Sequence, residues 1–415
     1  MDILFLCHRV PYPPDRGDRI TTWHFLQHML AEGHSVRLGC FREEERDAAA
    51  VTFLRSKGAE VEAPMLSRGW RKMWSLRGLL TGEALTIPFF AHGELRAAVD
   101  RWCAAKPPDL IYVYSSSMAQ YVLGRKGCPK AMHFAELDSD KWLQYATKSG
   151  WLGRWIYGRE AKKLLAFEDA VARDFDLSIV VSEVERELFT RRIPGVNPEV
   201  LPNGVDVDHF RSSGDSERHP HTLVFTGVMD YEPNVDGVQW FADECWPQLK
   251  ASHPDARFLI VGSRPNAAVK ALAQRAGIEV TGRVETTPPY FDRAAVAIAP
   301  LRLARGVQNK VLEAMSMGMP VVSTPEAAQG LGDVPAGTLS IHSQPPAMVA
   351  AIRELFDSPV RARAEGRAAA EWVRDHFRWQ NMYERLDTML LRLGLPARPQ
   401  HAPAGRAGDP TASRR

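Results

Sequence analysis

The stretch that decides the fold runs from Ala299 to Ser323 and reads APLRLARGVQNKVLEAMSMGMPVVS. It starts at the end of an apolar run of strand length and continues through a cationic loop that contains a glycine. The spacing then predicts a short helix over about residues 308–317, which stops at Gly318. A second apolar run reaches Ser323. A strand, a loop, a helix and another strand in this order are typical of an α/β fold with a parallel sheet.

The predicted helix carries two ionisable side chains on one face, because Lys310 and Glu313 are three residues apart. Lys310 lies in the first turn, where unpaired N–H groups and the helix dipole favour an anion. A cation there, with Arg305 just upstream, costs free energy against that dipole, and a bound phosphate would compensate for it. We interpret Arg305, Gly306, Lys310 and Glu313 as binding residues for a nucleotide diphosphate sugar, with Glu313 contacting ribose hydroxyls. The alternative is an amphipathic helix with two solvated charges.

Length and composition indicate a globular protein of two domains. At 415 residues the chain is too long for one ordinary core and fits two domains of about 150–200 residues. A net charge of +2 argues against a dedicated nucleic-acid binder, and five scattered cysteines indicate a reducing compartment without a disulfide framework or a zinc site. The sequence has no signal-peptide pattern and no apolar run of about 18 residues, so we expect a cytoplasmic protein.

Apolar runs of strand length alternate with longer amphipathic segments, which predicts two Rossmann-like domains with parallel sheets. The expected strands are residues 3–7, 35–40, 60–63, 110–114, 130–134 and 177–181 in the first half, and 222–227, 257–261, 278–281, 296–299 and 320–323 in the second. Ligands in such folds bind beyond the carboxyl ends of the strands, so the residues that follow each strand are the candidates for a site.

A Pro-Asn-Gly turn at residues 202–204 marks the expected domain boundary. We expect a first domain over residues 1–205 and a second over 206–375, facing each other across a cleft. A C-terminal helix at about 376–393 is expected to pack back on the first domain. Residues 396–415 are rich in Pro, Gly, Ala and Arg and are expected to form a disordered tail.

Two groups of polar residues follow strands in the first half. Arg16, Gly17 and Asp18 come before a helical pattern, where Gly17 would let a substrate approach backbone N–H groups. His133, Glu136 and Asp138 gather at the exit of another strand, together with Asp140 and Lys141, and such a density of ionisable groups is typical of a working site. A plain helix cap or a capping loop is the alternative interpretation of each group.

Three further candidates follow strands in the second half. Gly227 permits a close approach to the backbone, and Asn234 either caps the next helix or contacts a phosphate. Arg283 follows another strand and could stack on a nucleobase. The dinucleotide fingerprint Gly-x-Gly-x-x-Gly is absent, because Gly330-Leu-Gly332 lacks the third glycine and a following helix.

Basic and aromatic residues alternate in two segments, 68–77 and 151–159. Lys and Arg beside Trp suit the headgroup region of an anionic membrane, so a peripheral contact with the inner membrane is one interpretation. Ordinary helices whose Trp side chains pack inward are the other.

The order of these motifs resembles that of glycosyltransferase family 4, which has the GT-B fold. The motifs are Asn203-Gly-Val-Asp206, Gly227-Val-Met and Lys310-x-x-Glu313-Ala-Met-Ser-Met-Gly-Met-Pro-Val. The subgroup that is most similar comprises the sugar transferases associated with exosortase A (PEP-CTERM) systems and exopolysaccharide loci. It shares the start Cys7-His-Arg-Val-Pro-Tyr-Pro-Pro-Asp-Arg-Gly-Asp-Arg and the motif Asp138-Ser-Asp-Lys-Trp. The resemblance covers residues 2 to about 393.

The resemblance implies a nucleotide-sugar donor in the C-terminal domain and a glycan or lipid-linked acceptor on the N-terminal domain. It also implies transfer with retention at the anomeric carbon, and neither a cofactor nor a metal. Glu313 would match the second glutamate of the family's paired-glutamate motif, which contacts the donor ribose. The first glutamate is replaced by Arg305, and the family's diphosphate-binding Arg and Lys fall at Val228 and Asn234. Lys310 and Arg305 are the cations available to replace them.

The chemistry expected from these residues is stabilisation of a departing nucleoside diphosphate by fixed cations and helix N–H groups. Lys310 would act there, while His133 or Asp138 would position the acceptor. Asp138 would be the general base if the enzyme inverts instead. Asp138-Ser-Asp140 has the spacing of a metal motif, but it lies in the acceptor half. A nucleotide-sugar 2-epimerase and a catalytically silent partner of a polysaccharide assembly complex are the alternative functions.

Overall fold

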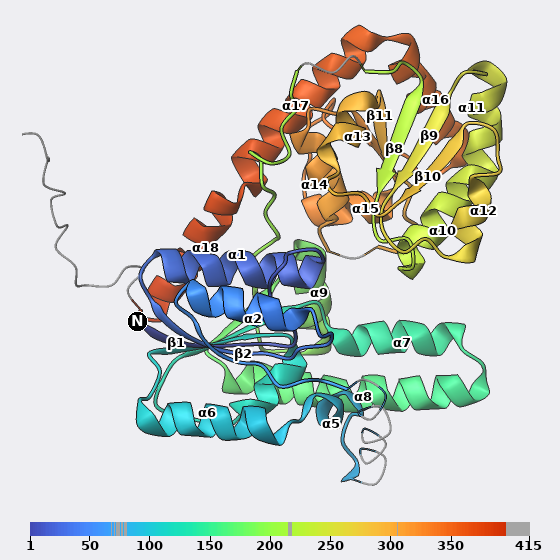
Figure 1. Ribbon diagram of the computed structural model, residues 1–415. Helices are drawn as coiled ribbons and strands as arrows, with labels where there is room; N and C mark the ends of the chain where they lie inside the picture. Colours follow the sequence, from blue (N-terminus) through green and yellow to red (C-terminus); the bar gives the residue numbers. More distant parts are fainter. Residues whose placement is uncertain are drawn as a thin grey trace, which may run out of the picture. The chain divides into compact units, whose positions relative to one another are not determined.

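A computed structural model describes residues 1–67, 69, 71, 75, 78, 81–214, 218–304 and 306–395. Two sheets organise these residues, one of seven strands and one of six (Figure 1). The expected C-terminal tail at 396–415 lies outside the described residues, as do Arg305 and most of the basic-aromatic segment 68–77.

The first sheet has the strand order β3-β2-β1-β4-β5-β6-β7. Its strands are β1 (Asp2–Cys7), β2 (Ser35–Gly39), β3 (Glu60–Glu62), β4 (Leu110–Tyr114), β5 (Lys130–Ala135), β6 (Leu177–Val180) and β7 (Glu199–Val200). β1 pairs in parallel with both β2 and β4, and the strand order reverses direction between β1 and β4. Such a reversal is where open α/β sheets bind ligands.

The second sheet has the order β10-β9-β8-β11-β12-β13 and parallel pairing throughout. Its strands are β8 (Thr222–Thr226), β9 (Arg257–Val261), β10 (Ile278–Gly282), β11 (Val296–Ala299), β12 (Val321–Ser323) and β13 (Ser340–Ile341). The order reverses between β8 and β11, so their carboxyl ends form the second place where a ligand is expected.

Helices fill the connections between the parallel strands. Those in the first half of the chain are α1 (Gly17–Ala31), α2 (Asp47–Ser56), α5 (Thr86–Phe90), α6 (Gly93–Ala105), η1 (Ser116–Tyr121), α7 (Asp138–Lys148), α8 (Trp151–Asp174) and α9 (Glu183–Arg192). Those in the second half are α10 (Glu232–Trp240), the π-helical segment η2 (Phe241–Cys245), α11 (Trp246–Ser252), α12 (Ala267–Leu272), α13 (Pro288–Arg293), α14 (Asn309–Ser316), α15 (Pro325–Ala328), η3 (Gln329–Leu331), α16 (Pro345–Asp357), α17 (Pro359–Phe377) and α18 (Trp379–Arg392).

The chain forms two compact units. The first comprises Met1–Met132, Asp174–Asp176 and the described residues from Asp387 onward. The second comprises His133–Arg173 and Leu177–Leu386. Within the first unit, His28 of α1 lies 3.0 Å from Asp387 of α18, measured between Nε2 and Oδ1.

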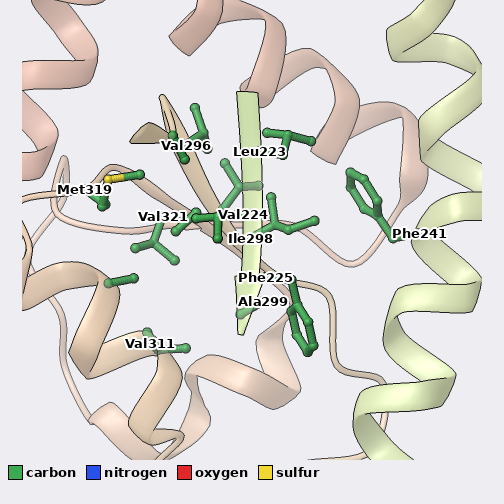
Figure 2. Packing of buried hydrophobic residues seen from close by; sticks show 14 of the residues in the cluster. Leu223, Val224, Phe225, Phe241, Val296, Ile298, Ala299, Val311, Met319 and Val321 are labelled. Carbon is green, nitrogen blue, oxygen red and sulfur yellow. The ribbon is translucent and has the colours of Figure 1, made fainter. Parts of the chain in front are cut away.

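The six-stranded sheet has an apolar core on both faces, as expected for parallel strands covered by helices. Figure 2 shows side chains of β8 and β11 packed against residues of α14, η2 and β12. The labelled members of this core are Leu223, Val224, Phe225, Phe241, Val296, Ile298, Ala299, Val311, Met319 and Val321. At the end of α14, Gly318 meets Gly366 of α17 so closely that a Cβ on Gly366 would lie 2.1 Å from the Gly318 carbonyl oxygen.

The two parallel-sheet Rossmann-like domains predicted from the sequence are confirmed. Every expected strand is present with ends that differ by one residue at most, and the expected helix at 308–317 spans Asn309–Ser316. The two short edge strands β7 and β13 were not predicted. The exact extents of the two domains stay a prediction.

Candidate functional site

The carboxyl end of β8 brings two loops together at the reversal point of the six-stranded sheet. Gly227 follows β8, and Gly262 follows the neighbouring strand β9 with a φ of +151°. A Cβ on Gly262 would lie 1.7 Å from the Gly227 carbonyl oxygen, so only glycine fits there. The Met229 N–H donates to the Ser263 carbonyl at 2.8 Å and joins the two loops further. Backbone therefore forms the floor of this region.

Asn234 lies in the first turn of α10 and is not its cap, because the N-cap is Tyr231. Its side chain is 3% exposed, and Nδ2 donates to the Val228 carbonyl at 2.9 Å. A Cβ on Gly227 would lie 2.7 Å from the same Nδ2 atom. Asn234 therefore fixes the loop that follows β8, and among the described residues its Oδ1 atom has no hydrogen-bond partner.

One arginine follows β9, the neighbour of β8, and another follows β10, the next strand of the sheet. Arg264 comes two residues after Gly262, has a φ of +57°, and pairs through Nε with Asp230 Oδ2 at 3.1 Å. Arg283 follows β10 directly and is exposed. Arg283 was a candidate from the sequence, whereas Arg264 was missed, although its place just after a strand was a usable signal.

The loop between β11 and α14 is fixed by the segment that follows β12. Gly306 has a φ of +59°, and a Cβ on Gly330 would lie 2.1 Å from the Gly306 carbonyl oxygen. Gln329 Nε2 donates to the Ala304 carbonyl at 2.7 Å, and Thr324 Oγ1 donates to the Leu301 carbonyl at 2.5 Å. Gly330 does not belong to a dinucleotide fingerprint, but it is needed for the close packing of its own backbone against that of Gly306. Arg305 belongs to this loop and lies outside the described residues.

Lys310 and Glu313 are placed as predicted, in the first turn of α14 and one turn later. Both are partly buried. Lys310 Nζ lies 5.6 Å from the centre of the Phe225 ring at the end of β8. Burial lowers the pKa of Lys310 to about 8, against the opposing charge of Glu313. Burial likewise raises the pKa of Glu313 to about 7, against the charge of Lys310. Each charge is poorly solvated, so a ligand that pairs with it would stabilise it.

Nucleotide affinity is expected to be greatest between about pH 7 and pH 8. A bound phosphate favours protonated Lys310, so affinity should fall as the pH rises above the lowered pKa of that side chain. A hydroxyl contact favours ionised Glu313, so affinity should fall as the pH drops below the raised pKa. Isothermal titration calorimetry with UDP and GDP from about pH 6 to pH 9 measures both limbs.

The control for this profile is Glu313→Gln. The variant should lose the part of the acid limb that belongs to the side chain and keep the part that belongs to the diphosphate, which titrates near about pH 6. Identical acid limbs in the two proteins would show that Glu313 does not contact the nucleotide.

An ionic cluster lies at the carboxyl end of β1 in the first unit. Asp18 in the first turn of α1 accepts a hydrogen bond from Arg9 and pairs with His8 Nε2 at 3.0 Å. Arg9 Nε also pairs with Glu43 Oε1 at 3.0 Å, and Arg16 Nε is 3.9 Å from Asp18 Oδ1. Burial would raise the pKa of Asp18, but His8 and Arg9 hold it far below its ordinary value. Asp18 is therefore a carboxylate with fixed partners.

His8, Arg9 and Glu43 were missed in the sequence, although His8 and Arg9 directly follow the first strand. The His8 ring stacks on Tyr114 with an interplanar angle of 12°, and its Nδ1 atom is buried without a hydrogen-bond partner among the described residues. In the neutral ring, Nδ1 is an acceptor when Nε2–H donates to Asp18, and a donor when Nε2 accepts from Arg9 Nη1 at 2.7 Å. Gly17 begins α1 in open space, since a Cβ there would meet nothing within 4 Å.

The group predicted at the end of β5 divides into buried and accessible residues. His133 lies within β5 and is 0% exposed, and burial lowers its pKa to about 3, so the ring is neutral. Glu136 and Asp138 are partly exposed, with Asp138 in the first turn of α7. Ala135, the last residue of β5, has a φ of +63°, a strained value of the kind found at functional sites.

The interpretation of this loop as a helix cap is wrong, because neither Asp138 nor Ser139 caps α7. The N-cap of α7 is Leu137, which forms no side-chain cap, and Glu168 of α8 instead accepts from the Ser139 N–H at 3.3 Å. Asp140 Oδ1 accepts from Arg192 at 2.7 Å, so that carboxylate already has a cationic partner. In the described part of the chain, no group of three His, Cys, Asp or Glu residues is arranged to hold a metal ion.

Two family models match the chain. One is described as a glycosyl transferase 4-like domain and matches residues 17–204, and the other is described as glycosyl transferases group 1 and matches residues 220–358. Together they span most of the sequence. The chain belongs to the GT-B glycosyltransferases. Within this family, the Lys310–Glu313 helix lies in the part matched by the group 1 model, and Asp18 and Asp138 lie in the part matched by the 4-like model.

Several curated proteins are similar to this glycosyltransferase. A glycogen synthase of Mycobacterium tuberculosis is 26% identical over 253 residues, which are 57% of this chain and 59% of that protein. A GDP-mannose-dependent phosphatidylinositol monomannoside mannosyltransferase of Mycolicibacterium smegmatis is 26% identical over 53% of this chain and 63% of its own length. An uncharacterized 44.6 kDa protein from the cps region of Klebsiella pneumoniae is 22% identical over 78% of this chain and 82% of that protein. The chain therefore matches about three fifths of the first two relatives.

Solved structures share the fold of this glycosyltransferase at low identity. A sucrose-phosphate synthase of Thermosynechococcus elongatus superposes with a TM-score of 0.71 at 17% identity, over 95% of this chain and 99% of that one. HepE of Anabaena in complex with UDP gives a TM-score of 0.65 at 15% identity, over 94% of this chain and 100% of that one. In the described parts of the chain, no helix is both long and apolar enough to span a bilayer.

Proposed function

We propose that this chain transfers a sugar, with retention at the anomeric carbon, from a nucleotide-sugar donor to a glycan or lipid-linked acceptor. The proposed setting is exopolysaccharide biosynthesis of the exosortase-associated type, in the cytoplasm with a peripheral contact on the inner membrane. The observation that carries the proposal is the pair at α14. Lys310 occupies the anion-favouring first turn with its ammonium poorly solvated, and Glu313 follows on the same face.

The donor would bind at the carboxyl ends of β8 and β11. Lys310 and the first-turn N–H groups of α14 would hold the diphosphate, with Arg305 and Gly306 contributing from the loop upstream. Glu313 would accept hydrogen bonds from the ribose hydroxyls. Gly227 and Asn234 would lie against the donor, and Arg283 against the base. The structures of HepE with UDP and with UDP-glucose support the choice of a nucleotide-sugar donor.

The acceptor would bind at the carboxyl ends of β1 and β5. Arg16, Gly17 and Asp18 would line one part of that site and Glu136 another. Asp138 would orient the acceptor hydroxyl. His133 is enclosed in β5, so its proposed role is to fix the strand exit that carries Ala135 and Glu136 rather than to touch the substrate.

The proposed chemistry needs no cofactor and no metal. As the bond from the anomeric carbon to the diphosphate breaks, negative charge develops on the leaving phosphate, and Lys310 with the α14 N–H groups stabilises that charge more in the transition state than in the ground state. In a front-face route, the leaving phosphate oxygen takes the proton of the acceptor hydroxyl. The acceptor oxygen then bonds to the anomeric carbon on the face that the phosphate left.

The proposal is tested with one protein preparation in two assays. Thermal shifts with UDP, GDP and ADP identify the nucleotide, because a ligand that binds the folded state raises its melting temperature. Transfer from the matching radiolabelled nucleotide sugars to a lipid-linked acceptor is then measured. The variant Asp138→Asn should keep the nucleotide affinity and lose transfer on the order of tenfold to hundredfold, because the acceptor is misplaced.

Asp169→Asn is the matched control, since Asp169 lies on α8 and pairs with Arg173 on the surface. It should transfer sugar at the wild-type rate. A wild-type rate in Asp138→Asn would remove Asp138 from the acceptor site. Epimerisation of the donor without incorporation into any acceptor, or nucleotide binding without turnover, would replace the proposed function by an epimerase or by a silent binding partner.

A further inference from the structure

Large apolar side chains are exposed at the turn between α7 and α8. Trp151, Leu152 and Trp155 in the first turns of α8 are 84%, 53% and 60% exposed. Leu143 and Tyr145 of α7 are 37% and 44% exposed. Single exposed apolar residues are normal on a protein surface, but three large ones together at the start of α8 indicate an interaction surface.

The two helices lie side by side and are joined by the two-residue link Ser149–Gly150 (Figure 1). Trp142 of α7 packs on Tyr157 of α8 with ring centres 5.5 Å apart, and the bond from Ser139 N–H to Glu168 joins their far ends. The hairpin is thus held together by other residues. Trp151 and Trp155 are one turn apart on the same helix face, and neither makes the contacts named above that join the two helices.

The charge of the same segment is strongly one-sided. Between residues 141 and 167 the sequence has one acidic residue, Glu160, and it is 1% exposed. The six basic residues of this segment are Lys141, Lys148, Arg154, Arg159, Lys162 and Lys163. Arg154, Lys162 and Lys163 are exposed on α8. This excess of positive charge would not strengthen binding to a protein partner with a neutral surface, whereas it would strengthen binding to an anionic surface.

We propose that the turn end of the α7–α8 hairpin docks on an anionic lipid bilayer. Trp151, Leu152 and Trp155 enter the headgroup region, where the indole ring suits the boundary between apolar chains and water. Arg154, Lys162 and Lys163 contact lipid phosphates. This surface specifies the membrane contact of the proposed function, and its biological role rests on that proposed function. Docking itself requires no nucleotide and no sugar transfer.

The test is co-sedimentation of the full chain with vesicles, without nucleotide. The vesicles are either phosphatidylcholine alone or equal parts of phosphatidylcholine and phosphatidylglycerol. The wild type should bind the anionic vesicles, and less well as salt is added. W151S with W155S should weaken binding about tenfold or more, because two apolar side chains no longer leave water. K162E with K163E should weaken binding to anionic vesicles by a similar factor.

Val360→Ser is the control, since Val360 is 72% exposed on α17 and belongs to no apolar group. It should bind vesicles like the wild type. Absence of wild-type binding to anionic vesicles, or equal binding by W151S with W155S, overturns the proposal. A wild-type dimer in sedimentation velocity that W151S with W155S abolishes would assign the surface to a second copy of the chain instead. Because nucleotide thermal shifts are recorded on the same variants, failure of docking is distinguished from failure of the transferase function.

Discussion

Lys310→Ala should weaken nucleotide binding by about tenfold to a hundredfold and slow sugar transfer by a similar factor. A hydrogen bond between charged groups contributes roughly 1.5–3 kcal/mol, and every 1.4 kcal/mol is about tenfold in affinity. The ammonium that is removed is poorly solvated, but its charge also stabilises ionised Glu313, so the pKa of Glu313 should rise further in the variant. The melting temperature of the free variant checks that the fold is retained. Calorimetric titration with the best nucleotide of the thermal-shift panel measures the affinity, and initial rates measure transfer.

Lys270→Ala provides the comparison, because Lys270 is an exposed lysine on α12 in the same unit. It should behave like the wild type in both assays. If Lys310→Ala also retained the wild-type affinity and rate, the helix α14 would be an ordinary amphipathic helix, and the donor site would have to be sought elsewhere.

Gly262→Ala should destabilise the chain by about 3 kcal/mol or more, which is a decrease in melting temperature of roughly 6–12 °C for the affected domain. The added methyl group would lie 1.7 Å from the Gly227 carbonyl oxygen, so the two loops at the end of β8 would have to separate. Nucleotide binding should be lost together with stability, since those loops form the floor of the candidate donor site. Differential scanning calorimetry with and without nucleotide measures both effects.

Gly332→Ala separates the two causes of that loss. Gly332 also has a positive φ, +75°, but a Cβ there would meet nothing within 4 Å. With a φ of +75° and a ψ of −148°, alanine there should cost only the backbone strain, about 1–3 kcal/mol, and leave nucleotide affinity unchanged. Equal losses in the two variants would show that the close contact between Gly227 and Gly262 is not what organises the loops.

The strands could be predicted to within a residue because central strands of parallel sheets are continuous apolar runs. β8, β9 and β11 are fully buried over nearly their whole lengths, so their composition alone marks them. β7 and β13 have two residues each and lie at sheet edges, where no burial pattern distinguishes a strand from a loop. They depend on the pairing partner rather than on their own sequence.

The candidate site was predictable only where it depends on local spacing. Lys310 and Glu313 are three residues apart on a helix that the sequence itself indicates. Asn234 was interpreted as a possible cap because asparagine is common at helix N-caps. Its actual hydrogen-bond partner is the carbonyl of Val228, six residues earlier in the chain. The pairing of Arg9 with Glu43 joins residues far apart in the sequence and becomes visible only when β1 and β2 are side by side.

The contact between Gly318 and Gly366 determines where an isolated donor-binding fragment could be cut. The group 1 family match ends at residue 358, before α17 begins. A fragment designed to that limit would lack Gly366 and the apolar side chains of Ala369, Trp372 and Val373, which belong to the same core as Val311 and Met315 of α14. Its exposed face would favour aggregation. A useful expression boundary therefore lies beyond Phe377, and a shorter protein that fails to bind nucleotide would report a truncated core rather than a missing binding residue.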